Sequence, residues 1–161
     1  MTLPRGKKQD LTPDGLWDGS GHWEDFESSG GNKSIYYTAP DKWIRVLDKW
    51  PGLRINFAHF GGGESIAASD TAWMETILSI LTKHPNAYTD IAFFTTPGLP
   101  EMLVDIKKKN PILSQRLMFG TDYVMVMLDE HLGGLKSYFD RFSGLDPRVL
   151  VENARVFLKL K

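Results

Sequence analysis

The feature that most constrains this 161-residue chain is an alternation of short apolar runs with segments of helical periodicity. Apolar runs at 53–59, 87–94 and 116–120 predict three strands. The expected helices lie at 41–50, 70–83, 100–109, 128–142 and 147–160. Because helices that alternate with strands serve as crossover connections, the pattern predicts an α/β fold with parallel strands.

Two architectures fit this order of elements, an open doubly wound sheet and part of a (β/α)₈ TIM barrel. A complete barrel of this kind takes about 250 residues. With 161 residues and three expected strands, the chain could form only about half of one. The expected fold class is therefore α/β, and the barrel alternative is a partial barrel.

The amino-acid composition argues against several classes of protein. A formal net charge of −1 argues against a nucleic-acid-binding protein, which normally carries a clear excess of Lys and Arg. The absence of cysteine excludes disulfides and thiolate metal sites. No apolar stretch approaches membrane-spanning length. We expect a soluble, cytoplasmic protein that binds neither membrane nor nucleic acid.

The chain divides into two regions by composition. Residues 1–33 are rich in Gly, Ser, Asp and Pro and are expected to form a loop-rich N-terminal arm. Residues 34–161 contain all the expected helices and strands.

Two chemistry-bearing residues come at the ends of expected strands. His59 ends the run 53–59 and stands before Gly61-Gly62-Gly63, and Asp122 follows the run 116–120. In parallel α/β folds, functional side chains collect at the carboxyl ends of the strands. An imidazole and a carboxylate there suit binding of a divalent ion and proton transfer. Asp90 is expected in the middle of its strand, with a structural role.

Four motifs in order carry a family resemblance. They are LRINFAHFGG at 53–62, HPNAYTDI at 84–91, RLMFGTDY at 116–123 and ENARVFL at 152–158. Together they resemble the C-terminal half of the amidohydrolase superfamily, in particular the amidohydrolase-related group that includes decarboxylases of aromatic and related acids. The resemblance extends over roughly residues 37–160.

The resemblance implies a TIM barrel of which this chain supplies the sixth, seventh and eighth strands. It implies that Asp122 binds a divalent metal, with zinc expected, and accepts a proton from the bound water. It also implies that His59 contacts the metal, its water or the substrate, and that Phe60 and Tyr123 line the substrate pocket. The implied activity is metal-dependent hydrolysis or non-oxidative decarboxylation of a small molecule.

The family's HxH metal ligands are absent from the sequence, so the chain is expected to hold only part of a metal site. Half a barrel also leaves strand edges open, which favours a homo-oligomer or association with an N-terminal half.

Alternatives remain open at this point. The chain could be a non-catalytic remnant or assembly module that pairs through its sheet edges. Gly61-Gly62-Gly63 could belong to a small phosphate-binding domain, although neither GxGxxG nor GxxxxGK[ST] is present. His59 could be a structural histidine, and Asp122 could cap the helix that follows it.

Overall fold

The protein was analysed as a computed structural model, which describes residues 38–128 and 133–160. The chain separates into two compact units, Met1–Ala39 and Pro40–Lys161, and the second contains the helices and strands of the described residues. The expected N-terminal arm at 1–33 lies outside the described residues. In the described part of the chain, no helix has the length and apolar character needed to cross a membrane.

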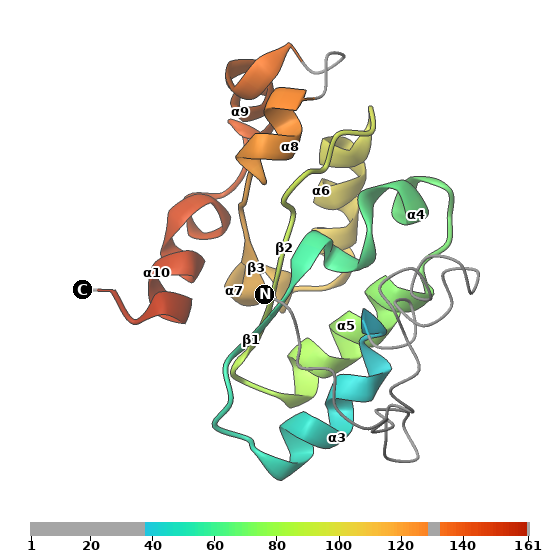
Figure 1. The fold of residues 1–161 in the computed structure, drawn as a ribbon, viewed down its shortest axis with the longest axis vertical. Helices are drawn as coiled ribbons and strands as arrows, with labels where there is room; N and C mark the ends of the chain where they lie inside the picture. The colour runs from blue at the N-terminus through green and yellow to red at the C-terminus, as the bar shows by residue number, and fades with distance from the viewer. Residues whose placement is uncertain (1–37, 129–132, 161) are drawn as a thin grey trace, which may run out of the picture. The chain divides into compact units, whose positions relative to one another are not determined.

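The centre of the second unit is a three-stranded sheet (Figure 1). Its strands are β1 (Ile55–Phe57), β2 (Ala87–Asp90) and β3 (Leu117–Met118). They are parallel and stand in the order β1-β2-β3, with Asn56 opposite Tyr88 and Thr89 opposite Leu117. The predicted parallel α/β arrangement is therefore confirmed.

Helices connect these strands, as the alternating pattern predicts. The chain passes from β1 to β2 through η1 (Ala58–Gly61), α4 (Gly63–Ala67) and α5 (Ala72–Lys83). It passes from β2 to β3 through α6 (Leu99–Lys109) and α7 (Leu113–Arg116), and α3 (Asp41–Lys49) precedes β1. In Figure 1, α3, α5 and α6 lie to the right of the strands and α10 (Asn153–Leu158) lies to the left.

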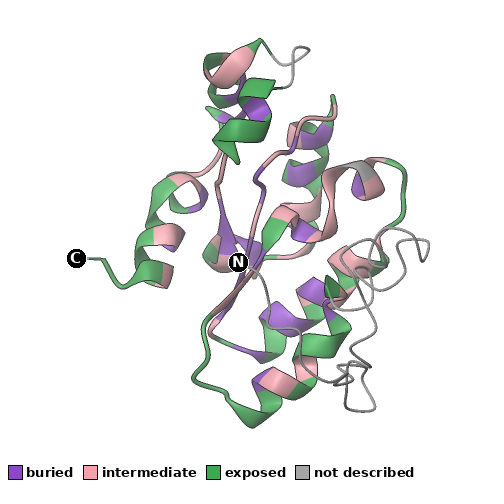
Figure 2. Ribbon diagram, in the orientation of Figure 1, coloured by how far each residue is buried: buried purple, intermediate pink, exposed green. Residues whose placement is uncertain are grey.

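The hydrophobic core lies between the sheet and these helices. Ile77, Ile80 and Leu81 place the inner face of α5 against the sheet, where Phe57 and Ala87 are buried. Figure 2 shows the buried residues along the strands and on the inner sides of the helices. Each fully buried aliphatic or aromatic side chain of this size stabilises the fold by about 1.5–3 kcal/mol. The core thus fixes the sheet whose ends carry the candidate site.

The C-terminal helices differ from the sequence-based expectation. The predicted helix at 128–142 is replaced in the described residues by α8 (Tyr123–Leu128) and α9 (Gly134–Phe142). The predicted helix at 147–160 begins with a π-helical turn, η3 (Arg148–Glu152), and continues as α10. Val151 and Leu158 in this segment are more than half exposed. The inward positions belong instead to Val149 and Asn153.

Asn153 turns inward because its amide bonds to the outer edge of β3. Its Nδ2 donates to the carbonyl oxygen of Leu117 at 2.7 Å and to that of Ser114 at 3.1 Å. The Phe119 N–H donates to the carbonyl oxygen of Val149 at 2.8 Å. The outer edge of β3 is thus covered by the chain's own C-terminal segment. In the described part of the chain, β1 has a strand partner on one side alone.

Candidate active site

Each of the three strands is followed, within four residues, by a residue with positive φ. The angles are 59° at His59 and 48° at Phe60 after β1, 53° at Phe93 after β2 and 51° at Asp122 after β3. Four of the six positive-φ residues other than glycine in the described part therefore lie at one end of the sheet. Such conformations cost about 1 kcal/mol or more each, and they concentrate at functional sites.

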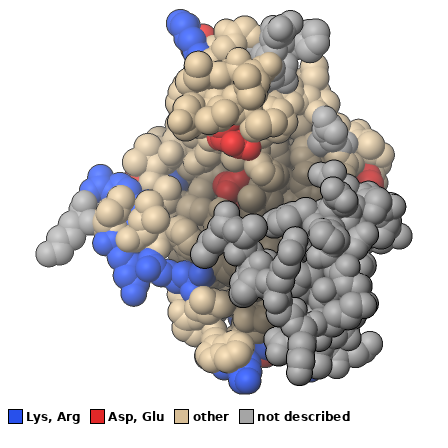
Figure 3. Space-filling view, viewed as in Figure 1, with Lys and Arg blue, Asp and Glu red and all other residues tan. Residues whose placement is uncertain are grey.

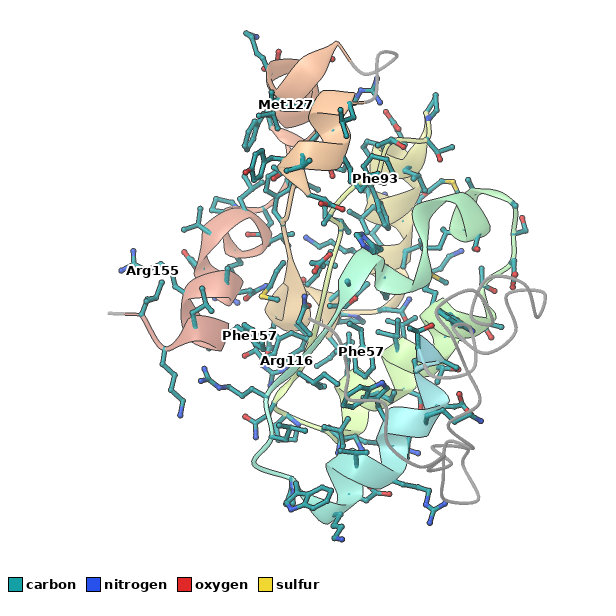
Figure 4. The ribbon with its side chains drawn as sticks, in the orientation of Figure 1. Phe57, Phe93, Arg116, Met127, Arg155 and Phe157 are labelled. Carbon is teal, nitrogen blue, oxygen red and sulfur yellow. The ribbon has the colours of Figure 1, made fainter. Side chains whose placement is uncertain are left out.

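Hydrogen bonds join the three strand ends into one surface. The Nδ1 atom of His59 lies 2.8 Å from the carbonyl oxygen of Ala92, and the next residue, Phe93, donates its N–H to the carbonyl oxygen of Thr121 at 3.3 Å. Thr121 directly precedes Asp122. The segments after β1 and β3 are thus hydrogen-bonded to two consecutive residues after β2, Ala92 and Phe93. Phe93 is labelled in Figure 4. His59 and Asp122 lie at the same edge of the sheet, as predicted.

The hydrogen bond to Ala92 determines which nitrogen of His59 is available. A carbonyl oxygen can only accept, so in the neutral ring Nδ1 carries the proton and Nε2 carries the lone pair. Within the described residues, Nε2 of His59 has no hydrogen-bond partner. It is therefore free to bind a metal ion or to exchange a proton with a ligand.

The Asp122 carboxylate is also uncommitted. It forms no hydrogen bond or ion pair with any other residue that the structure describes, and the residue is exposed. Helix α8 begins on the main-chain carbonyl of Asp122, which accepts from the N–H groups of Met125 at 2.9 Å and Val126 at 3.2 Å. The backbone, and not the side chain, thus starts this helix, and both carboxylate oxygens remain available.

Asp90 occupies a different place from the one predicted. It is the last residue of β2 and not a mid-strand residue, because the apolar residues after it already belong to a turn. Its carboxylate accepts from the His59 N–H at 2.9 Å, the Ala92 N–H at 3.0 Å and the Asn56 Nδ2 at 2.5 Å. These bonds are structural, as expected for Asp90, and they lie beside His59 at the end of the sheet.

Tyr138, which the sequence analysis did not single out, supports the same region from α9. Its side chain is fully buried, and its hydroxyl donates to the Ile91 carbonyl oxygen at 2.9 Å and accepts from the Phe94 N–H at 3.1 Å. Burial, above all, raises the pKa of Tyr138 to about 12, and the Asp90 and Asp122 carboxylates act in the same direction. Both carboxylates therefore act electrostatically on one hydroxyl.

The other two predicted site residues lie in contrasting environments. Phe60 is 0% exposed and packs in the hydrophobic core, so it presents no surface to a ligand within this unit. Tyr123 is 60% exposed at the start of α8, beside Asp122. In Figure 3 the surface around α8 and α9 is largely uncharged, with a few acidic atoms below it.

The glycine run after His59 serves close packing. A Cβ atom on Gly61 would lie 2.9 Å from the Met74 nitrogen, and one on Gly63 would lie 2.8 Å from Cδ1 of Leu99. Gly61 also has a φ of +87°, which side chains rarely tolerate. These contacts let α5 and α6 approach the end of β1. They account for Gly61 and Gly63 without a bound phosphate, and Gly62 has a φ of +105°.

His59 and Asp122 could supply part of the ligand set of a metal site. Imidazole nitrogen and carboxylate oxygen are both common zinc ligands, but a catalytic zinc takes about three from the protein. The described ranges 38–128 and 133–160 contain no cluster of three His, Asp or Glu side chains that could hold a metal. A surface hollow of about 550 Å³ lies beside residues 49–53 and is lined by neither His59 nor Asp122.

Comparisons with known proteins agree with this geometry. An uncharacterised TIM-barrel protein from Bordetella bronchiseptica has a similar solved structure, with a TM-score of 0.52 and 26% sequence identity. The match covers 78% of this chain and 41% of that protein, so this chain spans less than half of the complete barrel. No curated protein matches the sequence. The family model described as amidohydrolase matches residues 30–160. The chain, a partial TIM barrel, therefore belongs to the amidohydrolase family.

Proposed function

We propose that this chain contributes His59 and Asp122 to the active site of a metal-dependent hydrolase or non-oxidative decarboxylase that acts on a small molecule. One observation carries the proposal: a carboxylate and an imidazole nitrogen, neither bonded to any residue that the structure describes, lie at the strained carboxyl edge of a parallel sheet. In an α/β barrel this edge is where catalytic residues lie.

The two side chains have distinct roles in this proposal. Asp122 would hold a divalent ion, zinc in our proposal, and would accept a proton at its second carboxylate oxygen. His59 would use Nε2 either to complete the coordination or to orient water or substrate, since its Nδ1 is held by Ala92. When bound, the metal would supply a Lewis acid that lowers the pKa of water. Tyr123, exposed beside Asp122, would contact the substrate.

Completion of the site requires partners beyond the described residues. His59 and Asp122 supply two donors, and a catalytic zinc takes about three. We propose that the free side of β1 receives further barrel strands, either from another part of the protein or from another copy of it. The β3 side is a weaker candidate because Val149 and Asn153 already bond to it. The cytoplasm is the proposed compartment.

A screen for activity tests this proposal. The full chain, incubated with zinc, is assayed for hydrolysis of ester and amide substrates and for release of carbon dioxide from aromatic acids. Loss of the proton acceptor in Asp122→Asn is expected to lower activity by about 100-fold or more. Asp140→Asn is the matched control, because this exposed carboxylate pairs with Lys136 on α9.

The screen separates the catalytic proposal from a non-catalytic one. Activity that is zinc-dependent, lost in Asp122→Asn and retained in Asp140→Asn supports catalysis. Activity that survives Asp122→Asn contradicts the assigned role of Asp122. If the assembled protein, with further strands on the free side of β1, has no activity with any substrate, catalysis is contradicted and an assembly module becomes the better account.

A further inference from the structure

We propose that Asp90 is the positioning residue of this site, and that it holds His59 so that Nδ1 stays protonated and Nε2 stays free. The inference rests on the proposed role of His59. The Asp90 carboxylate contacts neither Asp122 nor the His59 ring, which are the proposed metal-binding groups. It acts instead through the backbone N–H groups of His59 and Ala92. Asp90 is thus distinct from the residues that would bind the metal.

The Asp90 carboxylate joins three groups from two strand ends. Its Oδ1 accepts from the His59 N–H at 2.9 Å and from the Ala92 N–H at 3.0 Å, and its Oδ2 accepts from Asn56 Nδ2 at 2.5 Å. Hydrogen bonds to an ionised acceptor are roughly twice as strong as neutral ones. A single charged group therefore fixes the position of His59 relative to Ala92.

This link controls the His59 ring because Ala92 is also the ring's partner. The Nδ1 atom bonds to the carbonyl oxygen of Ala92, and the N–H of the same residue bonds to Asp90. His59 itself has a left-handed backbone, with φ of 59° and ψ of 15°, which it would not adopt without support. Without Asp90, we expect the turn to relax and the Nδ1 contact to be lost.

Asn56 shows how tightly this junction is arranged. A carboxylate only accepts, so Asn56 must direct its NH₂ group to Asp90. Its carbonyl oxygen, Oδ1, is then buried with no hydrogen-bond partner among the described residues. Such an unpaired group is costly, which indicates that the Asp90 interaction outweighs the loss.

The arrangement also predicts which substitution should be tolerated. In Asp90→Asn the remaining carbonyl oxygen can still accept from His59 and Ala92 if the new NH₂ group faces Asn56. Rotation of the Asn56 amide would then present its Oδ1 as the acceptor. Asp90→Ala offers neither acceptor, so the two variants differ in their effect on His59.

The test is nitrogen NMR of the His59 ring in the full chain, above the pKa of the imidazole and without metal or substrate. We expect the wild type to favour the Nδ1–H form. Asp90→Ala should reduce the ratio of Nδ1–H to Nε2–H forms by roughly fivefold, the contribution of one hydrogen bond. Asp90→Asn should restore most of that ratio. Asp105→Ala, which removes an exposed carboxylate on α6 paired with Lys108, should leave it unchanged.

A ratio that is unchanged in a folded Asp90→Ala variant would overturn the proposal. If that variant does not fold, amide hydrogen exchange in Asp90→Asn provides the second test. The His59 and Ala92 amides should exchange roughly fivefold faster than in the wild type because their acceptor has lost its charge. Equal exchange rates would also overturn the proposal. Because no metal is used, failure of the proposed function would leave this result intact.

Discussion

Replacing Tyr138 by Phe tests how the C-terminal helices hold the site. The substitution removes one hydroxyl and keeps the ring, whose centroid lies 5.1 Å from that of Phe142 and 5.9 Å from that of Phe119. The Ile91 carbonyl and the Phe94 N–H lose their partner, and so does the Gly120 carbonyl, which lies farther from the hydroxyl at 3.3 Å. Ile91 and Phe94 belong to the segment that follows β2, and Gly120 belongs to the one that follows β3, so the change acts on two of the strand ends that carry the candidate site.

The expected magnitude follows from the two shorter of these bonds, to Ile91 and Phe94. A buried polar group that is left without a partner costs about 1–3 kcal/mol. Because relaxation can recover part of this, we expect Tyr138→Phe to lower the free energy of unfolding by about 2–4 kcal/mol. Urea denaturation followed by circular dichroism measures this difference. Tyr123→Phe is the control, because Tyr123 is 60% exposed, and it should change stability by less than about 0.5 kcal/mol.

The raised pKa adds a pH signature to the same variant. Burial keeps Tyr138 protonated up to about pH 12 in the folded state, whereas an unfolded tyrosine loses its proton near pH 10. The stabilisation is thus complete below pH 10 and is lost as pH rises from 10 to about 12. The stability difference between wild type and Tyr138→Phe should shrink across that window. A small difference at pH 7, or one that grows above pH 10, would refute this reasoning.

Three further substitutions test the packing around the sheet. Gly61→Ala should destabilise the protein by about 1–3 kcal/mol, because the new methyl group would lie 2.9 Å from a backbone nitrogen. Gly52→Ala is the control, since Gly52 has open space around it, and thermal denaturation should show no loss of stability for that variant. Asn153→Ala should cost about 2–3 kcal/mol in urea denaturation, because the Leu117 carbonyl loses its donor. Ser69→Gly should stabilise by about 1 kcal/mol, since φ is 65° at this residue, and an unchanged midpoint would contradict the assigned strain.

Helices with a clear apolar face could be predicted closely from the sequence. The predictions at 41–50, 70–83 and 100–109 agree with α3, α5 and α6 to within two residues at each end. Their periodicity reflects burial of one face, and the same burial stabilises the helix in the fold. The turns that carry the site have no such periodic signal.

The strand ends were predicted too long for a physical reason. Residues 58–60 and 91–94 are mostly apolar, and Phe60, Ile91 and Phe94 are buried, yet all of them lie beyond the strands. Apolar character reports burial and not backbone conformation. His59 and Phe93 have left-handed backbones where the chain leaves the sheet. Neither is a glycine or an asparagine, so the residue type did not indicate a left-handed turn at these positions.

The long-range support of the site was also beyond the sequence. The edge location of His59 and Asp122 follows from a general rule for parallel sheets, and this could be predicted. Tyr138 bonds to main-chain groups 44 and 47 residues away, and Asp90 bonds to His59 31 residues away. Main-chain partners leave no residue-type pattern, so a single sequence does not reveal such bonds.

Binding of zinc to the full chain tests the central claim most directly. In NMR titrations the His59 ring and the residues around Asp122 should respond to zinc together. His59→Gln and Asp122→Asn should each weaken zinc binding by about tenfold or more, which corresponds to a loss of about 1.4 kcal/mol of binding free energy. His84, which follows α5 and whose Nε2 lies 3.6 Å from Oδ1 of Asp48, should not respond first. Zinc that binds elsewhere, or that binds equally well to both variants, would contradict the assignment of this site.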